Sequence, residues 1–425
     1  MTEERFDIAV IGAGLAGLAA AAGAAETGRH VVLLDAHRPG GRAMVDDRNG
    51  YRFNRGPRAL YVGGAGAEVL RHFGVRTDTG GAPRLDGVML RRAGELHRQP
   101  VGVGSLLRTT LLSGREKAQA ARLLGGIGRI DATKLVGTTT RDWIDRSSRG
   151  RVADLLETIV RITTYTNAPE LLDAGAAAAS VRLGTSSGVR YLDGGFQSLV
   201  DGMIDAISPL GVQLRTGAGV DGVEPGRNGF RVTGPAGAFV VDSVVIATGG
   251  PDAARQLLPV PLDAWDRLGP AATVACLELG LRRLPTHAGV FGVDEPLYLN
   301  THCPPADLAP EGGAVVHAMR YQAPGDDMPA EQQKTILRGL AADAGILDAD
   351  IVEERFLGHM AVTGAIPTAA NGGLAGRPGA EVPGLPGAFV AGDWVGPVGM
   401  LADAALASGV HAGRLAAARS VRIAA

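Results

Sequence analysis

Residues 6–35 read "FDIAVIGAGLAGLAAAAGAAETGRHVVLLD", and this segment decides the fold. From Ile8 to Ala25 it holds 18 residues without a charge, which approaches the length of a membrane-spanning helix. The pattern nevertheless changes within the segment. A short β-branched run ends at Gly12, an Ala- and Leu-rich stretch continues to Gly28, and "RHVVLLD" is apolar again. These patterns are typical of a buried strand, a helix and a second buried strand. Because a spanning helix would not stop and restart at glycines, we predict a strand–helix–strand unit.

The glycines of this unit are spaced as in a nucleotide-binding loop. Gly12 permits a tight turn, Gly14 lets the backbone approach a diphosphate, and Gly17 lets the helix pack closely on the strand. The helix N-terminus then offers free N–H groups and a partial positive charge to phosphates. Asp35 ends the second strand, where its carboxylate can accept hydrogen bonds from ribose hydroxyls. An acid there repels a 2′-phosphate, so FAD or NAD fits better than NADP.

The composition limits the class of protein. The chain has 425 residues, 45% of them hydrophobic, which is enough for a large core and two domains. The net charge of −2 gives no basic field for a nucleic acid. Only two cysteines are present, Cys276 and Cys303, without a CxxC motif, so we expect neither a disulfide framework nor a metal site. The mixed charges of "MTEER" do not fit a secretory signal, and we expect a cytoplasmic protein.

Two further segments follow Asp35, "HRPGGRAM" (37–44) and "GYRFNRGPRALY" (50–61). Together with the glycine loop they resemble the FAD-binding family of amine oxidases and phytoene desaturases. The resemblance implies an α/β fold with an interrupted Rossmann-like FAD-binding domain and a substrate domain of mixed sheet plus helical cap. It also implies that the GG turn lies against the FAD diphosphate and that the segment around Gly56 approaches the isoalloxazine ring.

The middle and the end of the chain extend this resemblance. Residues 189–204, "VRYLDGGFQSLVDGMI", resemble a family segment in which a GG turn opens a helix, and "SVVIATGG" (243–250) resembles the strand before the substrate domain. Near the C-terminus, "GAFVAGDWVGPVGMLADAALASGVHAGRLAAA" (387–418) is the most specific match. There the resemblance implies that Asp393 binds the ribityl or diphosphate part of FAD. It also implies that the next helix points its N-terminus at flavin N1 and C2=O, where reduced flavin is negative.

The residues expected to bind FAD come from all of these segments. They are Gly12, Gly14, Leu15, Ala16, Gly17, Asp35, Ala36, Gly41, Arg42, Gly56, Pro57, Arg58, Ala59, Val220, Ala247, Gly392, Asp393, Gly399, Met400 and Leu401. For Val220, whose counterpart touches the adenine edge through its backbone, simple sheet packing is an equally good explanation.

We divide the chain accordingly into two discontinuous domains. The FAD-binding domain takes residues 1–75, 188–252 and 378–425. The substrate-binding domain takes residues 76–187, which are mostly helical in pattern, and 253–377, which mix strands with a helix. In the first part, "VGSLLRTTLL" (103–112) predicts a helix, and "TTTRDWIDRSS" (138–148) predicts a helix with a threonine cap. Basic residues recur in the apolar region 101–130. They allow a helix on a membrane surface, but a solvated face on amphipathic helices is favoured.

The candidate catalytic residues come from segments expected near the flavin: Arg58, Tyr298, His302 and Tyr321. Tyr298, Asn300 and His302 alternate in "LYLNTH" and so share one face of a strand. His302 could act as an acid or base near neutral pH, although a structural histidine is the favoured interpretation. Amine oxidases of this fold often use a lysine near flavin N5. Here the candidate, Lys334, lies in the polar pattern "AEQQKTILRGL" and is expected at the surface.

Three functions therefore compete. The first is an FAD-dependent oxidoreductase that dehydrogenates or desaturates a small to medium, partly apolar metabolite by hydride transfer to flavin N5, with oxygen or a quinone-like acceptor. The second is a flavin amine oxidase. The third is an FAD-free prenyl-binding chaperone of the same fold, like Rab escort and GDP-dissociation-inhibitor proteins. The intact phosphate loop, "GGR" and "AGD" favour an FAD enzyme with a small-molecule substrate. The oligomeric state is left open.

Overall fold

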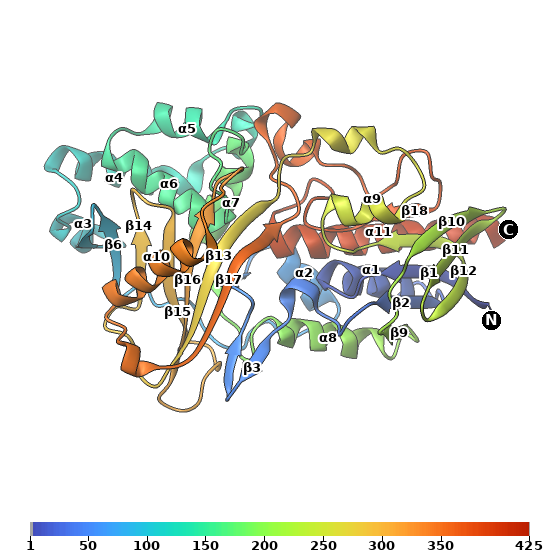
Figure 1. The fold of residues 1–425 in the computed structure, drawn as a ribbon. Helices are drawn as coiled ribbons and strands as arrows, with labels where there is room; N and C mark the ends of the chain where they lie inside the picture. The colour runs from blue at the N-terminus through green and yellow to red at the C-terminus, as the bar shows by residue number, and fades with distance from the viewer. Residues whose placement is uncertain (1–2, 425) are drawn as a thin grey trace.

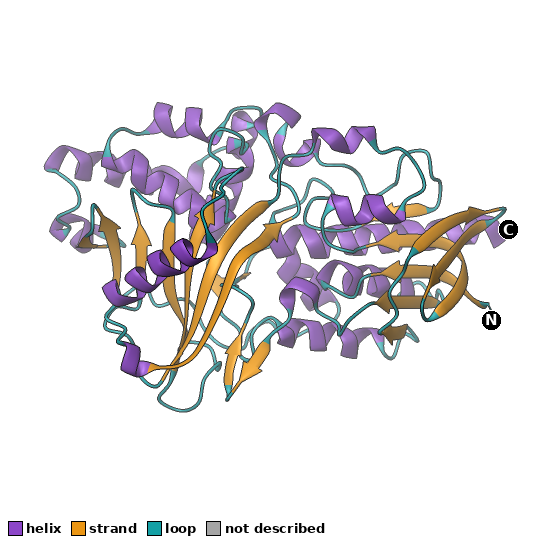
Figure 2. Cartoon of the chain, viewed as in Figure 1, coloured by secondary structure: helices purple, strands orange, loops and turns teal. Residues whose placement is uncertain are grey.

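A computed structural model describes residues 3–424, with side chains described as far as residue 419. Its strands form two large sheets, each covered by helices (Figures 1 and 2). The first sheet has the order β10-β11-β12-β1-β2-β9, and β18 pairs with the C-terminal end of β12. Its parallel strands are β1 (Glu4–Ile11), β2 (Val31–Asp35), β9 (Gln213–Thr216), β12 (Gly237–Ile246) and β18 (Ala388–Val390). Antiparallel strands β10 (Gly222–Gly226) and β11 (Gly229–Gly234) complete one edge.

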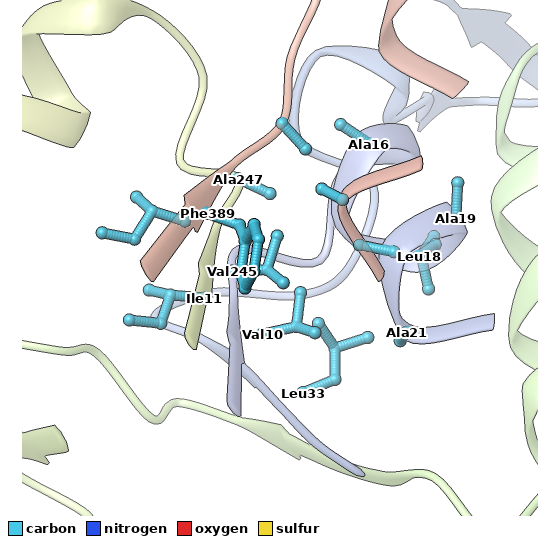
Figure 3. Close-up of a cluster of buried hydrophobic side chains, with 14 of the residues drawn as sticks. Val10, Ile11, Ala16, Leu18, Ala19, Ala21, Leu33, Val245, Ala247 and Phe389 are labelled. Atoms are coloured by element: carbon cyan, nitrogen blue, oxygen red, sulfur yellow. The ribbon is translucent and has the colours of Figure 1, made fainter. Parts of the chain in front are cut away.

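Helix α1 (Leu15–Ala25) is buried along its whole length. It packs against α11 (Leu401–Ala424), so the two ends of the chain lie side by side (Figure 1). Small residues make this approach possible, since a Cβ added to Gly413 would lie 2.1 Å from the carbonyl oxygen of Ala20. The Ala- and Gly-rich composition of both segments is therefore a packing requirement. Figure 3 shows the core beneath α1, where Val10, Leu33 and Val245 from three adjacent strands meet.

The uncharged stretch 8–25 is a strand followed by this helix, as the glycine pattern predicts. No helix among residues 3–424 combines the length and the apolar character needed to cross a bilayer. Helices α2 (Ala65–His72), α8 (Gln197–Ile207) and α9 (Pro251–Leu257) complete the helices around the first sheet.

The second sheet has the order β17-β13-β16-β15-β14-β6-β7 and is antiparallel except between β14 and β6. Its strands are β6 (Val88–Arg92), β7 (Glu95–Arg98), β13 (Ala272–Leu281), β14 (Gly289–Gly292), β15 (Leu297–Cys303), β16 (Ala314–Gln322) and β17 (Ile351–Thr363). Short strands β3 (Asp46–Arg48), β4 (Tyr51–Phe53), β5 (Leu60–Tyr61) and β8 (Val189–Arg190) pair in two separate ladders.

Helices cover both faces of the second sheet (Figure 2). On one face lies α10 (Ala330–Asp343), and on the other lie α3 (Val103–Arg108), α4 (Gly114–Gly126), α5 (Thr140–Ser147), α6 (Arg151–Thr164) and α7 (Ala174–Ser186). The predicted cap of α5 is present, since the hydroxyl of Thr139 accepts a hydrogen bond from the N–H of Asp142 at 3.1 Å. The predicted mixed sheet with a helical cap is confirmed.

One predicted helix is shorter than its pattern. The pattern in residues 103–112 is helical, but α3 ends at Arg108. Thr109 adopts an extended backbone, and its hydroxyl donates to the carbonyl oxygen of Arg98 at 2.8 Å. The chain leaves the helix at this point, and Leu111 and Leu112 beyond it are buried.

Candidate functional site

A cavity of about 1210 Å³ lies where the two sheets meet. Segments far apart in sequence line it: the loop after β1, the turn after β2, residues 218–221, residues 247–249 after β12, most of β17 and the start of α11. Of the residues predicted to bind FAD, those that line the cavity are Gly12, Gly14, Leu15, Ala16, Asp35, Ala36, Gly41, Arg42, Arg58, Val220, Ala247, Gly392, Asp393 and Leu401.

The glycine loop supplies a cradle at one end of the cavity. Gly12 has φ +100°, and a Cβ there would lie 2.6 Å from the carbonyl oxygen of Ala247. A Cβ on Gly17 would lie 1.7 Å from the carbonyl oxygen of Gly12. Glycine is therefore required at both positions because the neighbouring backbone leaves no room for a side chain. Gly14 differs, because its φ of −76° suits any residue and the nearest atom to an added Cβ is 3.9 Å away. The open space beside Gly14 faces the cavity and can hold a ligand instead.

The GG turn closes this cradle from the other side. The N–H of Gly40 donates to the carbonyl oxygen of Ala13 at 2.8 Å, and Gly40 pairs with Gly14 in an isolated bridge. No described side chain caps the N-terminus of α1, so its first N–H groups are left for a ligand. These residues fit the diphosphate of FAD: they offer N–H donors, a helix N-terminus and space without side chains.

Asp35 lies at the end of β2 and borders the cavity. Its carboxylate already accepts hydrogen bonds from two backbone N–H groups, that of Ala13 at 2.6 Å and that of His37 at 2.8 Å. A carboxylate has about four acceptor positions, so capacity remains for ribose hydroxyls. Asp35 therefore also holds the glycine loop in place, which the sequence pattern does not predict.

Asp35→Ala is expected to lower FAD affinity by roughly tenfold and to lower the melting temperature, because the N–H of Ala13 loses its acceptor. Fluorescence titration with FAD and thermal unfolding would measure the two effects. Asp7→Ala is the matched control, since Asp7 accepts the N–H of His30 at 2.9 Å in the same unit but does not line the cavity. Equal FAD affinity in both variants would contradict a ribose contact by Asp35.

An ion pair joins the two ends of the chain at the cavity wall. Arg42 Nη1 donates to Asp393 Oδ2 at 2.7 Å and to the carbonyl oxygen of Val362 at 2.8 Å. The other oxygen of Asp393 accepts the N–H of Gly364 at 3.1 Å. The charge of Asp393 raises the pKa of Arg42 against the opposing effect of burial. The "GGR" and "AGD" motifs are thus held together across the chain.

The N-terminus of α11 also reaches the cavity. Leu401 lines it and has φ +55°, a left-handed conformation that is unfavourable for a bulky residue and persists only where its surroundings impose it. Gly399 and Met400 do not line the cavity. Instead, the carbonyl oxygen of Gly399 accepts a hydrogen bond from Arg377 Nη1 at 2.9 Å, and the Ser180 hydroxyl donates to Met400 Sδ at 3.3 Å.

Asp403 in the first turn of α11 is buried beside α2. Burial raises the pKa of Asp403 to about 6, although its Oδ1 accepts the N–H of Gly66 at 2.9 Å. The folded protein therefore keeps this proton at pH values where the unfolded chain has released it. The contribution of Asp403 to stability consequently falls as the pH rises from about 4 to about 6.

Asp403→Asn is expected to match the parent in stability at pH 4 and to exceed it at pH 8 by up to about 3 kcal/mol, since asparagine never ionises and keeps an acceptor for Gly66. Urea unfolding followed by circular dichroism at both pH values would measure the difference. A stability difference that is the same at pH 4 and pH 8 would contradict the role assigned to burial of the charge.

The turn at Gly56 is held in place by a buried carboxylate. Gly56 has φ +87°, and its N–H donates to Oε1 of the fully buried Glu278 at 2.7 Å. Glu278 also pairs with Arg355, which in turn pairs with Asp46. Gly56, Pro57 and Ala59 do not line the cavity, whereas Arg58 does.

Three of the predicted catalytic residues lie away from this cavity. Tyr298, Asn300 and His302 share a face, as predicted, but Tyr191 covers it: its ring stacks on His302 with centroids 3.7 Å apart. His302 is fully buried, and burial followed by the charge of His317 holds its pKa well below the ordinary value. Tyr298 and Tyr321 lie within a hydrophobic cluster. Tyr298, His302 and Tyr321 do not line the cavity, whereas Arg58 does.

Sequence reasoning missed the wall formed by β17. Residues 355–362 line the cavity, including Arg355, Met360 and Val362. They were predicted only as part of a strand, because no glycine or acid motif marks them. Behind this wall, atoms of Cys276, Glu278 and His317 lie within 4.8 Å of one another. These three residues could in principle bind a metal ion. However, the Glu278 carboxylate already interacts with Arg355 and with the N–H of Gly56, and the positive charge of the Arg355 guanidinium disfavours a metal cation beside it.

Comparison with known proteins gives the family. Residues 15–299 match the sequence model of the family described as flavin containing amine oxidoreductase. The chain belongs to this family. It is therefore an FAD-dependent oxidoreductase. Its glycine cradle, Asp35 and the start of α11 border one cavity.

The relatives of this flavin-dependent oxidoreductase fall into two groups. It is 25% identical to the carotenoid 3,4-desaturase of Haloarcula japonica over 82% of this chain and 84% of that enzyme. It is 29% identical to a phytoene dehydrogenase of Streptomyces griseus over 53% of this chain and 50% of that enzyme. A solved putrescine oxidase variant superposes with a TM-score of 0.75 at 18% identity, covering 98% of this chain and 100% of the oxidase. At that identity the last similarity shows the fold alone.

Proposed function

We propose that this oxidoreductase dehydrogenates or desaturates a small to medium, partly apolar metabolite. The observation that carries the proposal is the character of the cavity wall beyond the diphosphate cradle. Met360, Val362 and Leu401 line it there, and all three also belong to or pack against the hydrophobic cluster between the second sheet and its helical cap. Apolar walls of this kind favour an apolar guest.

The absence of a lysine from the cavity wall supports the same choice. Among the described residues no lysine lines the cavity. Lys334 lies on α10, where Nζ is 3.0 Å from Glu354 Oε1 in a partly exposed ion pair. It is therefore not available to assist oxidation of an amine at the flavin. The amine oxidase function, which the family description and the fold of the putrescine oxidase support, is the second candidate. The FAD-free chaperone is disfavoured because the family binds flavin.

FAD, when bound, supplies the hydride acceptor at N5. The protein contributes position and exclusion of water. The glycine backbones and the N-terminus of α1 bind the diphosphate, the Arg42–Asp393 pair fixes the segments around it, and the start of α11 offers N–H donors to negative charge. The apolar cluster above the cavity keeps water from the reacting C–H bond.

Anaerobic reduction of the flavin tests the proposal. The purified yellow protein would be mixed without oxygen with lipophilic compounds that carry activated C–H bonds, and in parallel with primary and secondary amines. Bleaching by the first set and not by the amines is the expected result. Bleaching by amines alone would establish the second candidate. Adding oxygen or a quinone to the bleached protein would then identify the acceptor that restores the colour.

A further inference from the structure

Four arginines line the cavity, and three of them are paired with carboxylates. Arg42 is paired with Asp393 at 2.7 Å, and Arg55 Nε is 3.0 Å from Asp46 Oδ2. Arg355 is paired with both Asp46 and Glu278. Each of these three guanidinium groups therefore has a carboxylate partner within the protein.

The fourth is Arg58. Its only described hydrogen bond runs from Nη2 to the carbonyl oxygen of Arg55 at a long 3.3 Å, and its Nε is buried without a partner. No carboxylate of the described residues forms an ion pair with it. Burial, followed by the charge of Arg42, lowers the pKa of Arg58. An arginine stays protonated even so. Glu278 and Asp393 attract the guanidinium, but neither forms an ion pair with it, and a half-buried charge without a direct partner is unfavourable. A partner from outside the chain would remove this penalty.

The surroundings of Arg58 indicate where that partner lies. The diphosphate of FAD already has donors in the glycine cradle and the N-terminus of α1. Arg58 instead follows the Gly56 turn, which touches Met360: a Cβ added to Gly56 would lie 2.4 Å from Met360 Cε. Met360 packs against the hydrophobic cluster between the second sheet and its helical cap, as Tyr165 does. The unpaired cation thus stands at the border between the cavity and the apolar cluster.

We propose that Arg58 binds a carboxylate on the substrate, so that the substrate is an apolar molecule with one acidic group. This inference rests on the proposed function, whose substrate class it narrows. A guanidinium can grip a carboxylate through two parallel hydrogen bonds, while it repels an ammonium group. It therefore also explains why this cavity would reject a protonated amine of similar size.

Ligand binding to the FAD-loaded protein tests the inference without turnover. The probes are decanoate, the neutral decanamide and the cationic decylamine, which share one apolar chain, and the readout is perturbation of the flavin absorbance. The parent is expected to bind decanoate at least about tenfold more tightly than decanamide, and decylamine least tightly. Arg58→Met is expected to abolish the preference for decanoate. Arg58→Lys, which keeps the charge but loses the second hydrogen bond, is expected to retain part of it.

Arg227→Met is the matched control, because Arg227 is exposed in the β10–β11 turn, does not line the cavity and carries the same charge. It should leave the preference unchanged. Equal binding of decanoate and decanamide by the parent would overturn the inference, and so would a preference that survives in Arg58→Met. A changed flavin midpoint potential in Arg58→Met with an unchanged preference would instead assign Arg58 to the flavin. If decanoate is preferred but no lipophilic compound reduces the flavin, the proposed function fails and the inference stands.

Discussion

Gly14→Val is expected to give a folded protein that no longer retains FAD. The backbone of Gly14 is extended, with φ −76° and ψ 179°, so valine fits the local conformation. The nearest atom to an added Cβ is 3.9 Å away, so the side chain meets no protein atom closely. It projects into the open cradle that the diphosphate needs. We expect FAD affinity to fall on the order of 100-fold, as overpacking of a close contact does.

The ratio of flavin to protein absorbance after purification would measure this loss, with circular dichroism as the test of folding. Gly102→Val is the matched control, since Gly102 precedes α3 with an extended backbone, has no atom within 4 Å of an added Cβ and does not line the cavity. It should purify yellow. A Gly14→Val protein as yellow as this control would place the diphosphate elsewhere. Gly17 cannot serve in this test, because its Cβ would collide with backbone and disturb the fold itself.

Glu278→Gln is expected to destabilise the protein by about 3–5 kcal/mol. Burial by itself would raise the pKa of Glu278, but the interactions with His317 and Arg355 outweigh it and lower the pKa to about 2. The residue is therefore a buried anion at all ordinary pH values. Glutamine still accepts the N–H of Gly56, but it leaves the Arg355 guanidinium, which is 9% exposed, with Asp46 as its remaining partner. Losing one member of a buried charge cluster leaves an uncompensated charge.

Urea unfolding followed by circular dichroism would measure the change in free energy. Glu354→Gln makes the same chemical change in β17, where Glu354 pairs with Lys334 and Arg338 on a partly exposed surface. That variant should lose less than about 1 kcal/mol. Losses of similar size in both variants would show that the Glu278 cluster contributes no more than a surface ion pair.

Much of the fold could be predicted because its signals are local. The run from Phe6 to Asp35 contains its own turn, helix and strands, and the alternation in residues 297–303 marks a strand without reference to its neighbours. The helix predicted through Leu112 was too long, because a hydrogen bond from Thr109 to a distant carbonyl ends it at Arg108. No local pattern contains that information.

The functional site also combines residues that could be predicted from sequence with residues that could not. The spacing of the glycines and Asp35 is by itself typical of a nucleotide-binding loop, so their position beside a cavity could be predicted. The burial of His302 could not be judged from sequence, because the ring that stacks on it belongs to Tyr191, which is distant in the chain. The lining residues of β17 were missed for the same reason: they reach the site only because the two sheets meet there.

The sequence by itself therefore determined the cofactor-binding unit, since a tight turn, an open backbone position and an acid at a strand end are requirements met within a few neighbouring residues. Only the tertiary structure decided which charges are neutralised. Arg42 and Asp393 are 351 positions apart and form an ion pair, while Arg58 has none. Whether an arginine forms an ion pair depends on which distant segments fold against it. An arginine paired with a carboxylate of the protein has a structural role, whereas an unpaired one such as Arg58 can bind a ligand.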